Sequence, residues 1–76
     1  MNVIETSDIE LAAYAMARGG LLRLIEGDKG IAFRLEGRDV EEAEIDFAHF
    51  GPRGVARERM ERITDWLMET YGGRRS

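Results

Sequence analysis

The sequence predicts a single small α+β domain with a largely antiparallel three-stranded sheet and two or three helices packed on one face. Three observations support this fold class: a capped helical segment, two alternating segments around a turn, and two amphipathic helical segments. A short N-terminal strand gives the order β-α-β-β-α-α, for which helices on one sheet face are the simplest layered solution. The expected elements are a strand over 2–5, a helix within 6–20, a hairpin over 21–37, a short helix within 37–52 and a final helix over 55–71.

The length of 76 residues fits one domain, predicted over 1–73, followed by a disordered basic tail over 74–76. The chain has no cysteine, a net charge of −4 and no apolar run that could span a bilayer. The N-terminus "MNVIETSD" lacks the basic and apolar regions of a secretory signal. These features predict a cytoplasmic protein without a membrane partner, and the acidic balance argues against a nucleic-acid-binding domain of the usual basic kind.

The first helix carries both a start signal and a stop signal. Ser7 is the expected N-cap, with Glu10 completing a capping box three residues later. Asp8 places negative charge in the first turn, where the helix dipole favours it. Gly19 and Gly20 end the helix, and one of them is expected in the left-handed conformation after the C-cap.

This helix is unusual because it is apolar nearly all the way round between Glu10 and Arg18. A surface helix normally has one apolar stripe and one polar face. Two explanations remain open from the sequence. The helix can lie centrally, between the sheet and the C-terminal helix, with its alanines allowing close approach. Alternatively, one side of it is buried against a second copy of the chain.

The hairpin register follows from the alternation of apolar residues. A two-residue primed turn would force Lys29 to positive φ, so we expect a four-residue loop from Gly27 to Gly30 with Gly30 in the left-handed conformation. A slip by one residue would place apolar residues against charged ones. The expected pairs are Glu26 with Ile31, Leu24 with Phe33, Leu22 with Leu35, and Arg23 with Arg34.

The C-terminal part of the chain has two apolar stripes at helical spacing. Asp39 is the expected cap of the short helix, and Gly51, Pro52 and Gly54 separate it from the final helix. Trp66 is assigned to the core or its rim. The expected buried stripes are Val40, Ala43, Phe47 and Phe50 in the short helix, and Ala56, Met60, Ile63 and Leu67 in the final helix.

Few residues offer catalytic or metal-binding chemistry. The serines are Ser7, used by the cap, and Ser76, and no motif supplies a triad partner for His49, so no enzyme activity is expected. Glu42, Asp46 and His49 share one helix face and are weak candidates for a metal site, but no fourth ligand is indicated. We interpret them instead as the solvated face of an amphipathic helix. No cofactor is expected.

An anion site before the final helix is a further weak possibility. Gly51, Pro52, Arg53 and Gly54 precede a helix N-terminus, which can attract an anion, but the context of a phosphate-binding loop is missing. Glycine and proline between two helices are better interpreted as a chain break.

Arg23 and Arg34 form the most informative pair, because the register places two like charges opposite each other on the non-core face of the hairpin. One interpretation is that Glu36, Glu26 or a neighbouring strand neutralises them. The functional interpretation is a binding surface for phosphate or for an acidic protein. Leu21, Ile25 and Ala32 add apolar area to the same face, which suits a protein partner or self-association better than nucleic acid.

The stretch "TSDIELAAYAMARGG", followed by a hairpin with Phe33 and a helical end, resembles a family of short, mainly prokaryotic and phage-associated domains of unknown function. The similarity covers most of the chain, its specific part is the first quarter, and "GPRG" has no counterpart in the family pattern. The resemblance implies the strand–helix–hairpin–helix order and no activity. The matching residues are Thr6, Asp8, Leu11, Ala12, Ala13, Tyr14 and Gly19.

The sequence therefore favours a non-enzymatic protein-interaction module that binds an unknown protein, or a second copy as a homodimer, through Arg23, Arg34, Ile25 and Arg38. The alternative is a nucleic-acid-binding accessory factor that uses the Arg residues of the exposed sheet face with Arg38 and the basic tail. An RNA-binding sheet would carry exposed aromatic residues on this face, and none are present in the sequence there.

Overall fold

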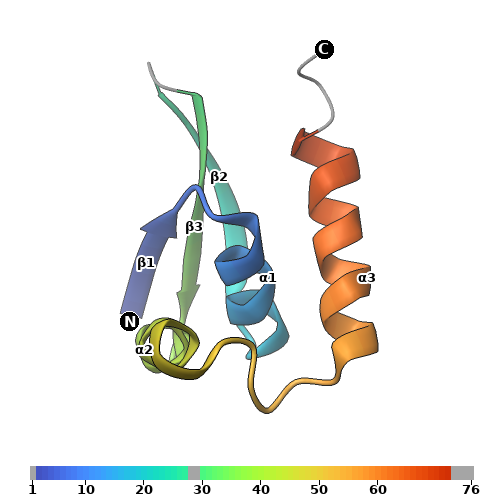
Figure 1. Ribbon diagram of the computed structural model, residues 1–76. Helices are drawn as coiled ribbons and strands as arrows, with labels where there is room; N and C mark the ends of the chain where they lie inside the picture. Colours follow the sequence, from blue (N-terminus) through green and yellow to red (C-terminus); the bar gives the residue numbers. More distant parts are fainter. Residues whose placement is uncertain (1, 28–29, 73–76) are drawn as a thin grey trace.

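The computed structural model describes residues 2–27 and 30–72 of the protein, except for the side chains of residues 25–31 and 72. The predicted tail over 74–76 lies outside the described residues. The described chain confirms the predicted α+β class, with an antiparallel sheet and helices on one face (Figure 1). Its elements are β1 (Asn2–Thr6), α1 (Ile9–Ala17), β2 (Leu21–Gly27), β3 (Gly30–Gly37), α2 (Val40–Phe50), α3 (Arg57–Leu67) and the π-helical turn η1 (Met68–Gly72).

The sheet has the strand order β1-β3-β2, so β3 pairs antiparallel with both of its neighbours. The predicted hairpin register is confirmed for all four pairs, from Leu22 opposite Leu35 to Glu26 opposite Ile31. The predicted loop length is wrong, because the ladder continues to Gly27 opposite Gly30 and leaves two residues between the strands instead of four.

The N-cap of α1 is Asp8, and the prediction of Ser7 is wrong. The Asp8 carboxylate accepts hydrogen bonds from the backbone N–H of Glu10 at 3.0 Å and of Leu11 at 3.4 Å. Thr6 ends β1, and its hydroxyl accepts a bond from the N–H of Asp8 at 3.0 Å, which holds Asp8 at the turn into the helix. At the other end, Gly19 has φ +99° and confirms the left-handed residue expected there.

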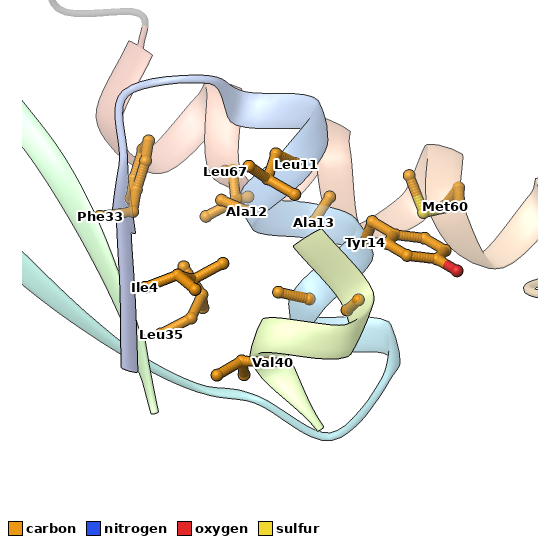
Figure 2. Packing of buried hydrophobic residues seen from close by; sticks show 12 residues of the cluster. Ile4, Leu11, Ala12, Ala13, Tyr14, Phe33, Leu35, Val40, Met60 and Leu67 are labelled. Atoms are coloured by element: carbon orange, nitrogen blue, oxygen red, sulfur yellow. The ribbon is translucent and has the colours of Figure 1, made fainter. Parts of the chain in front are cut away.

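α1 lies between the sheet and α3, as Figure 1 shows, and it also packs against α2. The buried residues of α1 run consecutively along the chain, so the helix has contacts on all sides. Figure 2 shows Leu11 and Ala12 close to Leu67 of α3, and Ile4 and Leu35 of the sheet facing the same core. The central-helix explanation is therefore confirmed, and this burial needs no second copy. The consecutive buried residues are Leu11, Ala12, Ala13, Tyr14 and Ala15.

Close packing around Gly20 joins the end of α1 to Val40 at the start of α2. The N–H of Gly20 donates to the carbonyl oxygen of Ala15 at 2.8 Å. A Cβ atom at Gly20 would lie 2.9 Å from that oxygen and 2.9 Å from Cγ1 of Val40. Val40 and Ala43 of α2 are buried, as predicted. Asp39 occupies the N-cap position of α2 as predicted, but its side chain makes no capping hydrogen bond.

The predicted stripe of α2 extends too far, because Phe50 is 60% exposed. Phe47 packs partly against the core, with its ring centroid 5.6 Å from that of Tyr14. Phe50 is the last residue of the helix, beside Gly51 with φ +74°, and its ring lies under the guanidinium of Arg53 at 4.8 Å. Helical spacing alone predicted a core position that the neighbouring elements do not reach.

α3 begins at Arg57, two residues later than predicted, after a connection in which Gly54 has φ +83°. Met60 and Leu67 are buried and Ile63 is partly buried, but Ala56 is an exposed N-cap residue, so that part of the predicted stripe is wrong. Trp66 is 48% exposed and lies at the rim of the core. Its ring is edge-on to Tyr71 of η1, and the Tyr71 ring in turn is edge-on to Phe33 of the sheet.

Candidate functional site

The sheet face opposite the helices is the candidate site, and we call it the open face. Successive side chains along a strand point to opposite faces of the sheet. Because Ile4, Phe33 and Leu35 point into the core, their neighbours along each strand lie on the open face. Ile25 belongs to it by register, but the side chain of Ile25 lies outside the described residues. The open face comprises Val3 and Glu5 of β1, Leu21 and Arg23 of β2, and Ala32, Arg34 and Glu36 of β3.

Arg23 and Arg34 lie directly opposite each other, as predicted. The carboxylate of Glu36 contacts both guanidinium groups: Oε2 lies 3.1 Å from Nε of Arg34, and Oε1 lies 3.4 Å from Nε of Arg23. Glu5 adds a longer contact, 4.0 Å from its Oε2 to Nη1 of Arg34. The Nε atom of Arg34 is buried without an aligned hydrogen bond, so its contact with Glu36 is mainly electrostatic. The interpretation that neighbouring carboxylates neutralise the pair is confirmed.

The four charges differ in how much of each side chain remains available. The side chain of Glu36, in the middle strand, is only 17% exposed because both arginines cover it. Arg23 on β2 is 64% exposed and Glu5 on β1 is 57% exposed. Arg34, in the middle strand, is 41% exposed but lies against Glu36, so the centre of the open face is internally paired, and the most exposed cation and anion, Arg23 and Glu5, lie on the two edge strands.

Apolar side chains lie beside these charges on the open face. Leu21 is 60% exposed, and Val3 and Ala32 are partly exposed. The register places Val3 and Leu21 on either side of Glu36 in one row across the sheet. A mixture of apolar and paired charged groups is typical of protein-contact surfaces.

Arg38 does not join the Arg23–Arg34 cluster. It follows the last residue of β3, and its carbonyl oxygen accepts a hydrogen bond from the side-chain amide of Asn2 at 2.9 Å. Arg38 is exposed and belongs to the turn between β3 and α2. Its backbone thus makes a contact that joins the end of β3 to the start of β1.

The sequence interpretation missed a second polar cluster, centred on Arg18 at the C-cap of α1. The Nη1 atom of Arg18 donates to the Tyr14 hydroxyl at 2.8 Å and to Oδ2 of Asp46 at 3.2 Å. The Tyr14 hydroxyl in turn donates to the carbonyl oxygen of Arg53 at 2.7 Å. The hydrogen bonds to Tyr14 and then to Asp46 raise the pKa of Arg18 above its usual value. The Arg18 cluster thus joins α1 to α2 and to the loop before α3.

This cluster corrects the weak metal candidates. Asp46 is bonded to Arg18, and Oε1 of Glu42 lies 3.7 Å from Nη2 of the same guanidinium. Nδ1 of His49 donates to the carbonyl oxygen of Ile45, on its own helix, at 2.9 Å. Within residues 2–27 and 30–72, no group of three histidine, cysteine or acidic side chains is arranged to hold a metal ion. A nearby guanidinium also repels a divalent cation.

The structure also weakens the anion interpretation of the loop before α3. A hollow of about 500 Å³ lies between the start of α1, this loop and α3. Its polar lining includes the carboxylates of Glu10, Glu61 and Asp65, while Arg57 lies 3.8 Å from Glu61 in an ion pair. The carboxylates of this hollow outnumber the arginine in its lining, which opposes anion binding there.

Comparisons of the chain with protein-family models, with curated proteins and with solved structures give no match. The resemblance to phage-associated domains of unknown function stays a prediction. Among the described helices, none combines the length and the apolar character needed to cross a bilayer. The geometry of the open face is therefore the basis for a proposed function.

Proposed function

We propose that this protein is a non-enzymatic protein-interaction module that uses the open face as its contact surface. The observation that carries the proposal is the exposed Leu21 beside a charge cluster that is already neutralised. Burying paired charges under a partner costs less than burying free ones, and Leu21 and Val3 supply apolar area for the contact.

The same geometry supports a protein partner over nucleic acid. Affinity for nucleic acid comes largely from cations that neutralise phosphates. On the open face, Arg23 and Arg34 both lie against Glu36, and together with Glu5 these four residues sum to zero formal charge. The two basic side chains thus have carboxylate partners before any ligand arrives.

The test is capture of proteins from a cell lysate by the immobilised chain and by two matched variants. Leu21→Ser changes the open face, while Ile45→Ser changes an equally exposed aliphatic residue on α2, at 58% against 60%. We expect Leu21→Ser to lose most of the captured protein and Ile45→Ser to retain it. Equal capture by all three proteins would refute the open face as the contact surface.

A parallel titration with fluorescent single- and double-stranded oligonucleotides addresses the alternative. Phosphate contacts weaken steeply as salt rises. Oligonucleotide binding that disappears between low and physiological salt, and that Arg23→Gln weakens, would replace the protein-partner proposal with the nucleic-acid one. We expect no such binding.

A further inference from the structure

We infer that the open face docks a second copy of this chain, face to face, about a two-fold axis parallel to β3. The inference builds on the proposed function and names its partner. It depends on the order of charges and apolar groups across the three strands, since a two-fold dimer requires a surface complementary to itself.

Two rows of residues cross the open face from β1 through β3 to β2. The first row is Glu5, Arg34 and Arg23, and the second is Val3, Glu36 and Leu21. Each row therefore carries different groups at its two ends. In the first row the ends have opposite charge, and in the second both ends are apolar.

A two-fold axis along β3 places β1 of one copy over β2 of the other while keeping each row at the same height. Glu5 then faces Arg23 of the second copy, and Val3 faces its Leu21. Symmetry makes each of these contacts twice. Arg34 and Glu36 lie near the axis, where each faces its own copy, and the 3.1 Å contact between Nε of Arg34 and Oε2 of Glu36 within each chain offsets both charges.

An alternative two-fold axis in the plane of the open face runs across the strands, between the two rows. It would pair Arg34 with Glu36 of the second copy, but it would also press Val3 against Glu5 and Leu21 against Arg23. The exposure of the side chains favours the axis along β3 over the axis across the strands. Glu36 is only 17% exposed, so little of its carboxylate can contact a second copy. The two most exposed charges are Glu5 and Arg23, and the axis along β3 pairs them.

The size of the open face sets the strength of the dimer. Three strands spaced about 4.8 Å apart make a narrow surface, well below the roughly 800 Å² per partner of a standard interface. The dimer is therefore a weak one that forms at high protein concentration, and it weakens as salt screens the Glu5–Arg23 pairs.

The experiment uses the full chain and two charge reversals, Glu5→Arg and Arg23→Glu. Each variant alone replaces two attractive contacts with two repulsive ones, so its self-association is expected to weaken about tenfold or more. An equimolar mixture of the two variants restores opposite charges at both contacts. We expect the mixture to associate within about threefold of the wild-type affinity, measured by sedimentation velocity up to about 1 mM.

Controls separate folding from association. Circular dichroism checks that each variant is folded, and Arg57→Glu, which reverses an exposed charge on α3, should leave the dimer unchanged. A wild-type chain that stays monomeric at about 1 mM, or a mixture that fails to recover, overturns the inference. If Leu21→Ser still loses protein captured from lysate in that case, the open face binds a different protein and the proposed function stands.

Discussion

Replacing Tyr14 by Phe removes one oxygen atom from the centre of the Arg18 cluster. That hydroxyl accepts from Arg18 at 2.8 Å and donates to the Arg53 carbonyl at 2.7 Å. The aromatic ring keeps its packing against Phe47, at 5.6 Å between centroids. The change therefore isolates two hydrogen bonds, one of them from a charged donor.

The expected loss of stability depends on which hydrogen bonds Arg18 and the Arg53 carbonyl keep without the Tyr14 hydroxyl. Arg18 keeps Asp46 at 3.2 Å, and the carbonyl of Arg53 lies in an exposed loop where water can replace the lost donor. A neutral bond contributes about 0.5–1.5 kcal/mol and a bond to a charged group about 1.5–3 kcal/mol. With this partial compensation we expect Tyr14→Phe to lower the free energy of unfolding by about 2 kcal/mol, or the melting temperature by about 10 °C.

The assay is urea denaturation followed by circular dichroism, with Tyr71→Phe as the matched control. Tyr71 packs edge-on against Phe33 and Trp66, and its hydroxyl has no hydrogen bond to any described residue. The same chemical change there should cost less than about 0.5 kcal/mol. If Tyr14→Phe costs no more than Tyr71→Phe, the Arg18 cluster does not stabilise the junction of the helices.

Three further tests, two pairs of substitutions and one titration, address the fold and the site. Gly20→Ala should cost about 1–3 kcal/mol, since its Cβ would meet two atoms at 2.9 Å. Gly37→Ala, with its nearest neighbours at 3.5 Å, should change stability by less than about 0.5 kcal/mol; equal effects in urea denaturation would contradict the close approach. Leu67→Ala should cost about 2–5 kcal/mol and the half-exposed Trp66→Ala clearly less, and thermal melts with the reverse order would contradict the assigned helix face. Calorimetric titration with micromolar zinc should give no binding heat, because Asp46 is bonded to Arg18, and saturable heat that Asp46→Asn abolishes would reinstate the metal site.

The hairpin register was predictable because it depends on local alternation. One residue of slip would have exchanged the two faces of β2 and β3, so the positions of Leu22, Leu24 and Phe33 allowed a single solution. The opposition of Arg23 and Arg34 followed from that register. What the register could not reveal was the exposure of each charge, since this depends on which rotamers bring Glu36 between the two arginines.

Other features depended on distances along the chain that no local pattern encodes. Arg18 and Asp46 are 28 residues apart, and their contact exists because α2 crosses the end of α1. Phe50 and Ala56 had the spacing of core residues but lie where no neighbouring element covers them. The N-cap moved from Ser7 to Asp8 because β1 extends to Thr6, and strand ends are set by pairing rather than by propensity.

The central place of α1 has a consequence for folding during synthesis. This helix is made before α3, yet α3, whose last residue is Leu67, covers one of its sides. The β1 strand likewise cannot pair until β3, which ends at Gly37, has been made. A nascent chain that ends before Leu67 therefore leaves the apolar surface of α1 uncovered. The fold can close only when the chain as far as Leu67 has left the ribosome, and truncation of α3 should expose α1, the most apolar of the three α-helices.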